Sequence, residues 1–230
     1  MTSTARPAFY ALRSGGWRDY VTLLHLPYTV WHLSYVAIGA ALAPTLKWGL
    51  LGWTALAFLL AMGVGAHALD ELSGRPLRTH IPSAVLVALA AVSIAAAAAI
   101  GIVIAARSTL WLLAFVAFGA AIVVAYNLEL FGGALHTDVW FAAAWGAFPV
   151  LTAYFASAER IRGEAVAAAA FAFLVSLAQR RLSTEVRRVR RGAERPPDAE
   201  LLLHAPEAAL RLLALALPAL AGALLLLRSG

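Results

Sequence analysis

The stretch PSAVLVALAAVSIAAAAAIGIVIAA, from Pro82 to Ala106, decides the fold class because it contains no ionisable residue. It exceeds the ~20 apolar residues that an α-helix needs to cross the hydrocarbon core of a membrane. Long runs of alanine, leucine and valine are typical of spanning helices, whereas a membrane β-barrel shows short segments of alternating polarity. We therefore expect this stretch to be a transmembrane helix.

Similar apolar segments lie on both sides of this stretch, separated by proline and glycine breakers. Six more qualify as spans: Tyr20–Ala43, Trp48–Leu69, Thr109–Tyr126, Val139–Ala156, Gly163–Gln179 and Ala205–Leu227. In the last of them Glu207 and Arg211 are four residues apart, a spacing that allows contact on a helix. The sequence thus predicts an all-α membrane protein with about seven transmembrane helices, forming one domain over residues 1–230.

The composition excludes a water-soluble globule and a disordered chain. Of 230 residues, 62% are hydrophobic and 13% are charged, whereas an ordinary soluble domain has about 25% charged residues. Disorder requires low hydrophobicity and high charge. The chain has no cysteine, which rules out disulfides and thiolate sites. A net charge of +6 then indicates loops facing anionic lipid headgroups, and no nucleic-acid partner is expected.

Basic residues gather in the N-terminal segment, in the loop after the second predicted span, and after the sixth. Cytoplasmic loops carry such an excess of lysine and arginine. We therefore expect an integral protein of a bacterial plasma membrane, with a cytoplasmic N-terminus and an external C-terminus. The polar clusters of the chain fall on this cytoplasmic side.

The first cluster is AHALDELSGRPLRT, Ala66–Thr79. His67, Asp70 and Glu71 share one face of a helix. Carboxylate oxygens suit Mg²⁺, which in turn binds phosphate, and an imidazole can serve as general acid or base. Arg75 and Arg78 can pair with these acids or clamp a phosphate. The alternatives are a helix end facing water and ordinary anchoring by basic residues.

Other candidates come from four more segments of the chain. His25 and His32 belong to a polar stripe in the first span, which lines a ligand chamber or forms interhelical hydrogen bonds. Aromatic residues of the fifth span, such as Trp145, serve packing or line a slot for an isoprenoid or acyl tail. Asn127 and Glu129 lie in the fourth loop. After the sixth span, Arg180 and Arg181 can neutralise a bound anion, whereas the arginines from Arg187 to Arg195 are typical of a segment at the lipid surface.

The pattern resembles the UbiA-type family of intramembrane prenyltransferases. Asp70 matches an aspartate of the family's first acidic motif, and Arg75-Pro76-Leu77 matches the loop that follows it. LLHLPYT (Leu23–Thr29) is similar to the entry of the family's first helix, and AWGAFPVLTAYFA (Ala144–Ala156) to its fifth. Tyr126 stands where a loop tyrosine is common. The second acidic motif is absent, because SLAQRRLSTEVRRVRRG (Ser176–Gly192) contains Glu185 as its only acid.

This resemblance implies a UbiA-like bundle around a lipid-accessible chamber, in which Mg²⁺ and an isoprenyl diphosphate bind. Its residues would then take the following roles. Asp70 and Glu71 would bind Mg²⁺, and His67 would be a ligand or proton acceptor. Phosphate would be bound by Arg75, Arg78, Arg180 and Arg181. The acceptor of the prenyl group would be oriented by Asn127 and Glu129.

The favoured function is an enzyme that transfers or cyclises an isoprenoid. A first alternative is a non-catalytic protein that binds isoprenoids or other lipids, or a partner subunit. A transporter is the third possibility, since acidic residues in a membrane can bind protons or cations.

Overall fold

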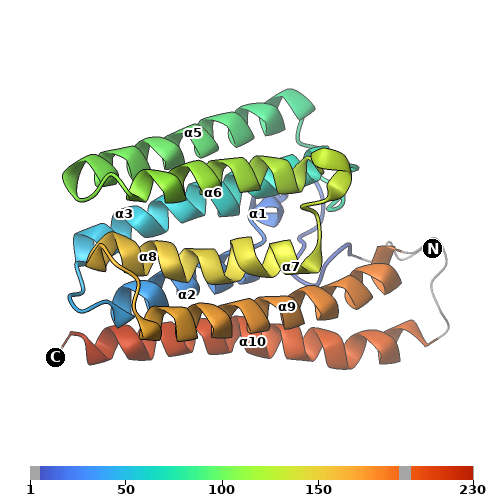
Figure 1. Cartoon of the computed structure of the whole chain (residues 1–230). Coiled ribbons are helices and arrows are strands. Elements are labelled where there is room, and N and C mark those ends of the chain that lie inside the picture. The colour runs from blue at the N-terminus through green and yellow to red at the C-terminus, as the bar shows by residue number, and fades with distance from the viewer. Residues whose placement is uncertain (1–5, 192–197, 230) are drawn as a thin grey trace.

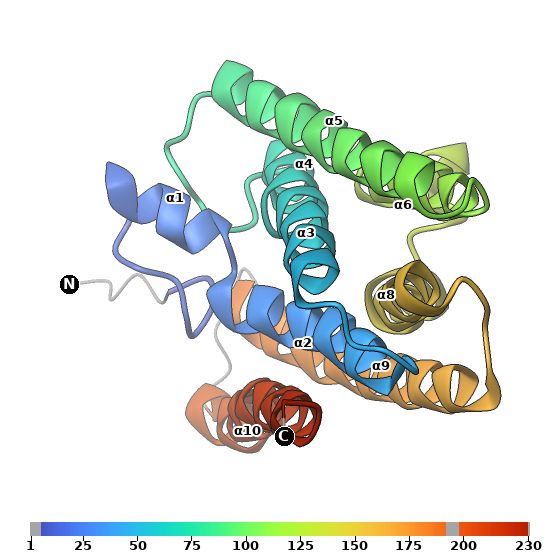
Figure 2. The same cartoon turned by 90° about the vertical axis from the view of Figure 1, so that its left-hand side faces the viewer.

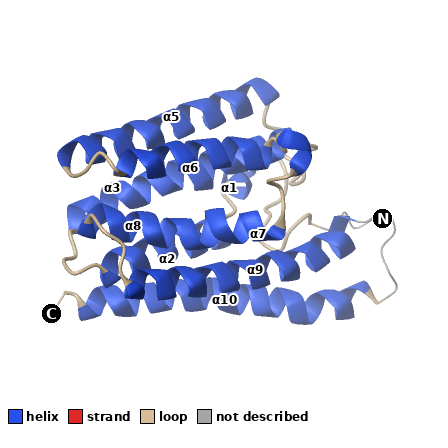
Figure 3. Cartoon of the chain, in the orientation of Figure 1, coloured by secondary structure: helices blue, strands red, loops and turns tan. Residues whose placement is uncertain are grey.

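The computed structural model describes residues 6–191 and 198–229 of the chain. Every regular element within these ranges is a helix (Figure 1, Figure 3). The predicted all-α class is therefore confirmed over this part of the protein. The elements are α1 (Trp17–Leu23), α2 (Leu26–Leu42), α3 (Trp48–Phe58), η1 (Leu59–Ala66), α4 (His67–Leu72), α5 (Ser83–Arg107), α6 (Leu112–Asn127), η2 (Phe131–Gly133), α7 (Asp138–Phe141), η3 (Ala142–Ala147), α8 (Phe148–Ala158), α9 (Gly163–Arg191) and α10 (Ala199–Leu227).

Five helices in the described ranges are long and apolar enough to cross a membrane: Trp48–Leu72, Ser83–Arg107, Asp138–Ala158, Gly163–Arg190 and Ala199–Leu227. The first joins α3, η1 and α4 into one rod, and the third joins α7, η3 and α8. The two other predicted spans correspond to α2 and α6, which have 17 and 16 residues. These long apolar helices are consistent with an integral membrane protein, while the count of about seven spans stays a prediction.

The outer surface of α10 has the character of a lipid-facing helix. Leucine side chains are exposed along it, at Leu201, Leu212, Leu215 and Leu226. Contiguous exposed apolar surface of this kind is rare on soluble monomers. The predicted contact between Glu207 and Arg211 is present in the same helix, with 3.7 Å between their charged atoms.

The first predicted span is interrupted, which corrects the expected range 20–43. Helix α1 ends at Leu23, and α2 begins at Leu26. His25 between them adopts a left-handed conformation with φ 45° and ψ 45°, and Pro27 occupies the first turn of α2. Proline has no backbone N–H and suits the start of a helix, so the chain begins a new helix here. The break brings His25 to the end of the bundle.

The helix that contains the sixth predicted span is several turns longer than that span. Helix α9 continues beyond Gln179 to Arg191, through the arginine-rich segment that the sequence placed after the span. Ser183 and Val186 are buried on this extension, and Val186 packs in one cluster with Leu203 and Leu210 of α10. Arginine is a good helix former, and the buried residues fix one face of the extension. Arg195 lies outside the described residues.

Helix α2 lies at the centre of the packing, in contact with α8 and α10 (Figure 2). A Cβ atom on Gly39 would lie 2.3 Å from the Val150 carbonyl oxygen, so glycine permits the close approach of α2 to α8. Helices α5 and α6 lie side by side and pack against the α3–η1–α4 rod. Small residues at helix crossings are typical of membrane bundles, where dispersion contacts replace the hydrophobic effect.

Candidate functional site

A polar cavity of about 340 Å³ opens at the end of the bundle that contains α4, α7 and the last turns of α9. Figure 1 shows this end on the right, opposite the end at which α10 finishes. Nine of the residues singled out in the sequence line it: His25, His32, His67, Asp70, Tyr126, Asn127, Glu129, Trp145 and Arg180. The structure thus brings together side chains from α2, the α3–η1–α4 rod, α6, η3 and α9.

Two π-helical segments, η1 and η3, border this cavity. Such segments are rare and frequently occur at functional sites. A Cβ on Gly146 in η3 would lie 2.5 Å from the Ala172 carbonyl oxygen, which shows how closely η3 approaches α9. A Cβ on Gly63 in η1 would lie 2.9 Å from Thr29 Cγ2 of α2. These close approaches set the distances between the helices that carry the cavity-lining side chains.

His67 has a defined tautomer. Its Nδ1 lies 3.1 Å from the Gly63 carbonyl oxygen. A carbonyl accepts only, so Nδ1 donates, and Nε2 is the basic nitrogen of the neutral ring. The ring stacks on that of His25, with 3.9 Å between centroids and 20° between planes. In its neutral form the His67 ring therefore has its basic nitrogen at Nε2, and the residue lines the cavity.

Arg180 is held in place by residues that the sequence analysis gave no role. Its Nε donates to Asp138 Oδ1 at 3.2 Å, and one terminal nitrogen donates to His136 Nε2 at 3.3 Å. His136 Nδ1 in turn donates to the Tyr126 carbonyl oxygen at 2.9 Å. The guanidinium carbon lies 5.4 Å from the centroid of the Phe141 ring. Arg180 thus enters the cavity with part of its charge already neutralised by Asp138.

Glu71 does not line the cavity, unlike its neighbour Asp70. Its side chain is fully buried and accepts hydrogen bonds from the backbone N–H groups of Leu77 and Thr79, both at 2.9 Å, and from Thr79 Oγ1 at 2.8 Å. The carboxylate is therefore an internal support for the loop that follows α4. These hydrogen bonds differ from the role of metal ligand that was expected for Glu71. A sequence motif does not show where adjacent side chains point.

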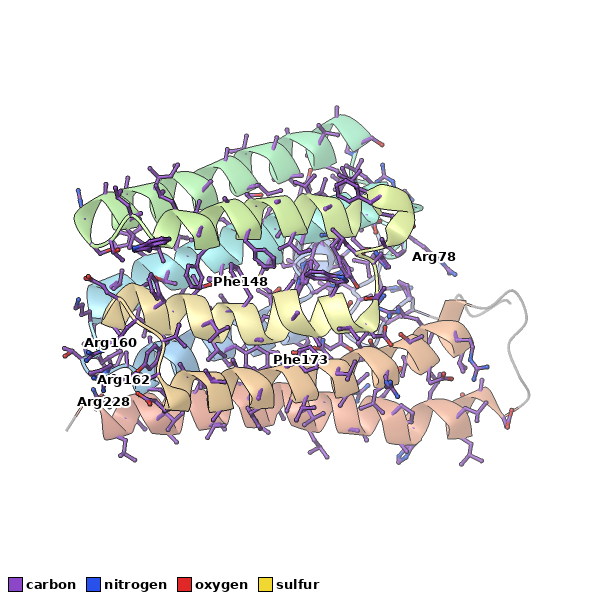
Figure 4. All side chains as sticks on the ribbon, viewed as in Figure 1. Arg78, Phe148, Arg160, Arg162, Phe173 and Arg228 are labelled. Carbon is purple, nitrogen blue, oxygen red and sulfur yellow. The ribbon has the colours of Figure 1, made fainter. Side chains whose placement is uncertain are left out.

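Three predicted phosphate-binding arginines also lie outside the residues that line the cavity. Arg75 donates to the Ile81 carbonyl oxygen and to Ser83 Oγ, so it closes its own loop. Arg78, labelled in Figure 4, and Arg181 are exposed. The arrangement leaves Arg180 as the one member of this predicted set that lines the cavity in the described part of the chain.

Some residues that line the polar cavity were not predicted from the sequence. Arg187, Gln179 and the segment Pro7–Tyr10 line the cavity. Arg187 is seven residues after Arg180, which is a spacing of two helical turns. A prediction of helix for the arginine-rich segment would therefore have placed both residues on one face. The N-terminal segment carries no such signal. It docks through Ala8 and Ala11, which pack with Leu77.

A second cavity, of about 90 Å³, is lined mainly by apolar side chains. Trp145 lines both. The apolar cavity lies among the α3–η1 rod, α5, α6 and α8, and Phe148 of α8 (Figure 4) reaches the helix α6 near Gly119. Ala98, Phe58 and Met62 belong to the same lining. The pair of cavities offers polar walls at the bundle end and apolar walls deeper in the bundle.

The donor set does not fit a Mg²⁺–diphosphate site of the kind that the resemblance implies. The described residues contain no group of three or more His, Cys, Asp or Glu side chains suited to holding a metal. Asp70 and Glu129 both line the cavity, but Glu71 is engaged in its loop. The resemblance implies two acidic motifs that together hold the Mg²⁺ ions, whereas the carboxylates that line this cavity among the described residues are Asp70 and Glu129.

No family model, no curated protein and no solved structure matches the chain. The UbiA-type resemblance therefore rests on the sequence motifs alone.

Proposed function

We propose that the chain is a UbiA-like membrane enzyme, with about seven transmembrane helices, that acts on an isoprenoid or a related lipid. The observation that carries this proposal is that one residue, Trp145, lines both the polar and the apolar cavity. An amphipathic ligand needs both environments, since its chain prefers apolar walls and its head needs hydrogen bonds. Prenyl transfer or cyclisation is the favoured reaction class.

The residues around the polar cavity supply the groups that such chemistry requires. His67 accepts a proton at Nε2, because the Gly63 carbonyl holds the other nitrogen in its protonated form. Arg180 and Arg187 supply positive charge close to Tyr126, and Asn127 lies at the end of α6 beside them. The lining of the second cavity is largely apolar, and such walls would shield reactive isoprenoid intermediates from water.

The lipid part of this proposal is tested by blocking the apolar cavity. Ala98 lines it, whereas Ala99, the next residue of α5, is exposed on the outer face. Protein is purified in mild detergent, and the lipids it retains are extracted and identified by mass spectrometry. We expect the wild type and Ala99→Phe to retain an apolar-chain lipid that Ala98→Phe loses. Equal retention by all three proteins would contradict the proposed binding site.

The catalytic part is tested with His67→Gln, which removes the basic Nε2. Incubation of the lipid-loaded wild type in membranes should yield a transferred or cyclised product, and the variant should retain the lipid without converting it. A wild type that binds lipid without converting it would favour a non-catalytic lipid-binding protein. The lack of a metal-holding cluster among the described residues supports that second candidate.

A further inference from the structure

Residues 6–14 form part of the wall of the polar cavity without belonging to a helix. Four consecutive residues of this segment contribute to the lining: Pro7, Ala8, Phe9 and Tyr10. None of these side chains carries a charge at neutral pH. The segment, called here the N-terminal strap, therefore adds a wall to the cavity and no charged group.

The N-terminal strap bridges two parts of the bundle that are distant in the chain. Ala8 and Ala11 pack with Leu77, in the loop after α4. Phe9 packs against a cluster from α9 and α10 that consists of Val186, Leu203 and Leu210. The strap thus extends from the loop after α4 to the α9–α10 pair, along the wall of the polar cavity.

Ring contacts hold the part of the strap that lines the cavity. The Tyr10 ring centroid lies 5.2 Å from that of His25 and 5.5 Å from that of Tyr28. The Phe9 ring lies 6.2 Å from Tyr28, and the guanidinium carbon of Arg211 lies 5.1 Å from the Phe9 centroid. Ring contacts of this kind are individually weak. This part of the strap can therefore detach while the helices stay folded.

Polar contacts hold the other end of the strap, where it joins α1. Ser14 Oγ donates to the Arg78 carbonyl oxygen at 3.1 Å and lies 2.9 Å from His80 Nδ1. The next backbone N–H, that of Gly15, donates to Asp19 Oδ1 at 2.8 Å. Asp19 is buried, and its Oδ2 accepts from the His80 backbone N–H at 2.8 Å. These hydrogen bonds anchor the end of the strap to the loop after α4.

We propose that the N-terminal strap is a lid on the polar cavity, which opens at Phe9 and Tyr10 while Ser14 stays anchored. Segments that open locally are those held by few buried contacts, and ligand-binding lids belong to this class. An open strap admits water and water-borne molecules to the cavity, and a closed strap keeps them out. This gating goes beyond the proposed function, because it applies to any occupant of the cavity.

Thiol labelling of the purified full chain in detergent measures access to the cavity. The chain has no cysteine, so one introduced thiol reports on one position. Asp70→Cys places the thiol at a partly exposed residue of the lining, and Ser73→Cys places it at an exposed residue of the same lining. With a water-soluble maleimide, we expect Asp70→Cys to react more slowly than Ser73→Cys.

Removal of the two rings of the strap should open the cavity. We expect the double variant Phe9→Ala/Tyr10→Ala to raise the labelling rate of Asp70→Cys about fivefold and to leave that of Ser73→Cys unchanged. The matched control is Trp17→Ala/Tyr20→Ala, which removes two exposed rings of α1 outside the cavity lining. It should change neither rate. An unchanged rate in the strap variant, or an equal rise in the control, would overturn the proposal.

Hydrogen exchange of the unsubstituted chain shows whether the strap opens by itself. Its amides, including the Leu12 N–H that donates to Thr22 Oγ1 at 3.0 Å, should exchange much faster than those in the middle of α2. Protection of the strap equal to that of α2 would show a fixed wall and refute the lid. Either result leaves the isoprenoid function intact, since that function is tested by the lipid that the protein retains.

Discussion

The neighbouring carboxylates Asp70 and Glu71 should respond very differently to substitution. Glu71 is fully buried and accepts three hydrogen bonds from the loop after α4, whereas Asp70 lines the polar cavity. A hydrogen bond to a charged group contributes ~1.5–3 kcal/mol, and breaking a buried charged contact costs ~3–5 kcal/mol. Water can reach part of a loop at the end of the bundle and offset some of this loss.

We therefore expect Glu71→Ala to lower the free energy of unfolding by about 3–5 kcal/mol. Glu71→Gln should cost about 2 kcal/mol, because one oxygen still accepts while the new NH₂ group faces a backbone N–H. Asp70→Asn is the matched control, because it replaces a carboxylate by an amide of similar size, as Glu71→Gln does. It should cost less than about 1 kcal/mol in stability and should instead impair turnover of the lipid substrate.

Reversible unfolding in mixed micelles with increasing SDS, followed by tryptophan fluorescence, measures these differences. The order of stability is the decisive result. The wild type and Asp70→Asn should be the most stable, Glu71→Gln should be less stable, and Glu71→Ala should be the least stable. If Glu71→Gln were as stable as Asp70→Asn while losing turnover, Glu71 would be a ligand-binding residue and the assignment to the loop would be refuted.

Three further predictions concern packing, metal dependence and the support of Arg180. Gly39→Ala should lower stability by about 1–3 kcal/mol, because its Cβ would lie 2.3 Å from the Val150 carbonyl oxygen. Gly52→Ala in α3, where the new Cβ meets open space, should not lower stability and should raise it by up to about 1 kcal/mol in the same SDS titration, because alanine is the better helix former. Chelation of divalent cations should leave the mass of retained lipid unchanged, and a lipid lost on chelation would show a metal-dependent site. Asp138→Asn should reduce turnover several-fold through loss of the charged contact to Arg180 without changing the amount of retained lipid, which native mass spectrometry would check.

Much of the fold could be predicted from local patterns. Apolar runs give the existence and approximate bounds of α5, α8 and α10, because each residue in a membrane must satisfy its backbone polar groups within its own helix. The break at His25 and the length of α9 were harder to predict. Both depend on which side chains are buried by neighbouring helices, as Val186 is by Leu203 and Leu210.

The candidate site shows the same division. Composition and spacing predicted that His67, Asp70, Asn127 and Arg180 lie at one end of the bundle, and all four line one cavity. The opposite roles of Asp70 and Glu71 could not be predicted, because adjacent helical positions differ by ~100° in direction. His136 and Asp138 carry no motif, and they become relevant only because tertiary packing places Arg180 of α9 against them.

The sequence by itself therefore determined a helical chain built for the membrane, with its polar residues gathered towards one end of the spans. Hydrophobic length and helical periodicity are local properties, and they act in the same way wherever a segment sits in the bundle. Only the tertiary structure decided that the polar residues line one cavity and apolar residues another, with Trp145 in the lining of both. The helices that carry these side chains approach closely at Gly146, between η3 and α9, and at Gly63, between η1 and α2, which are contacts between segments distant in the chain.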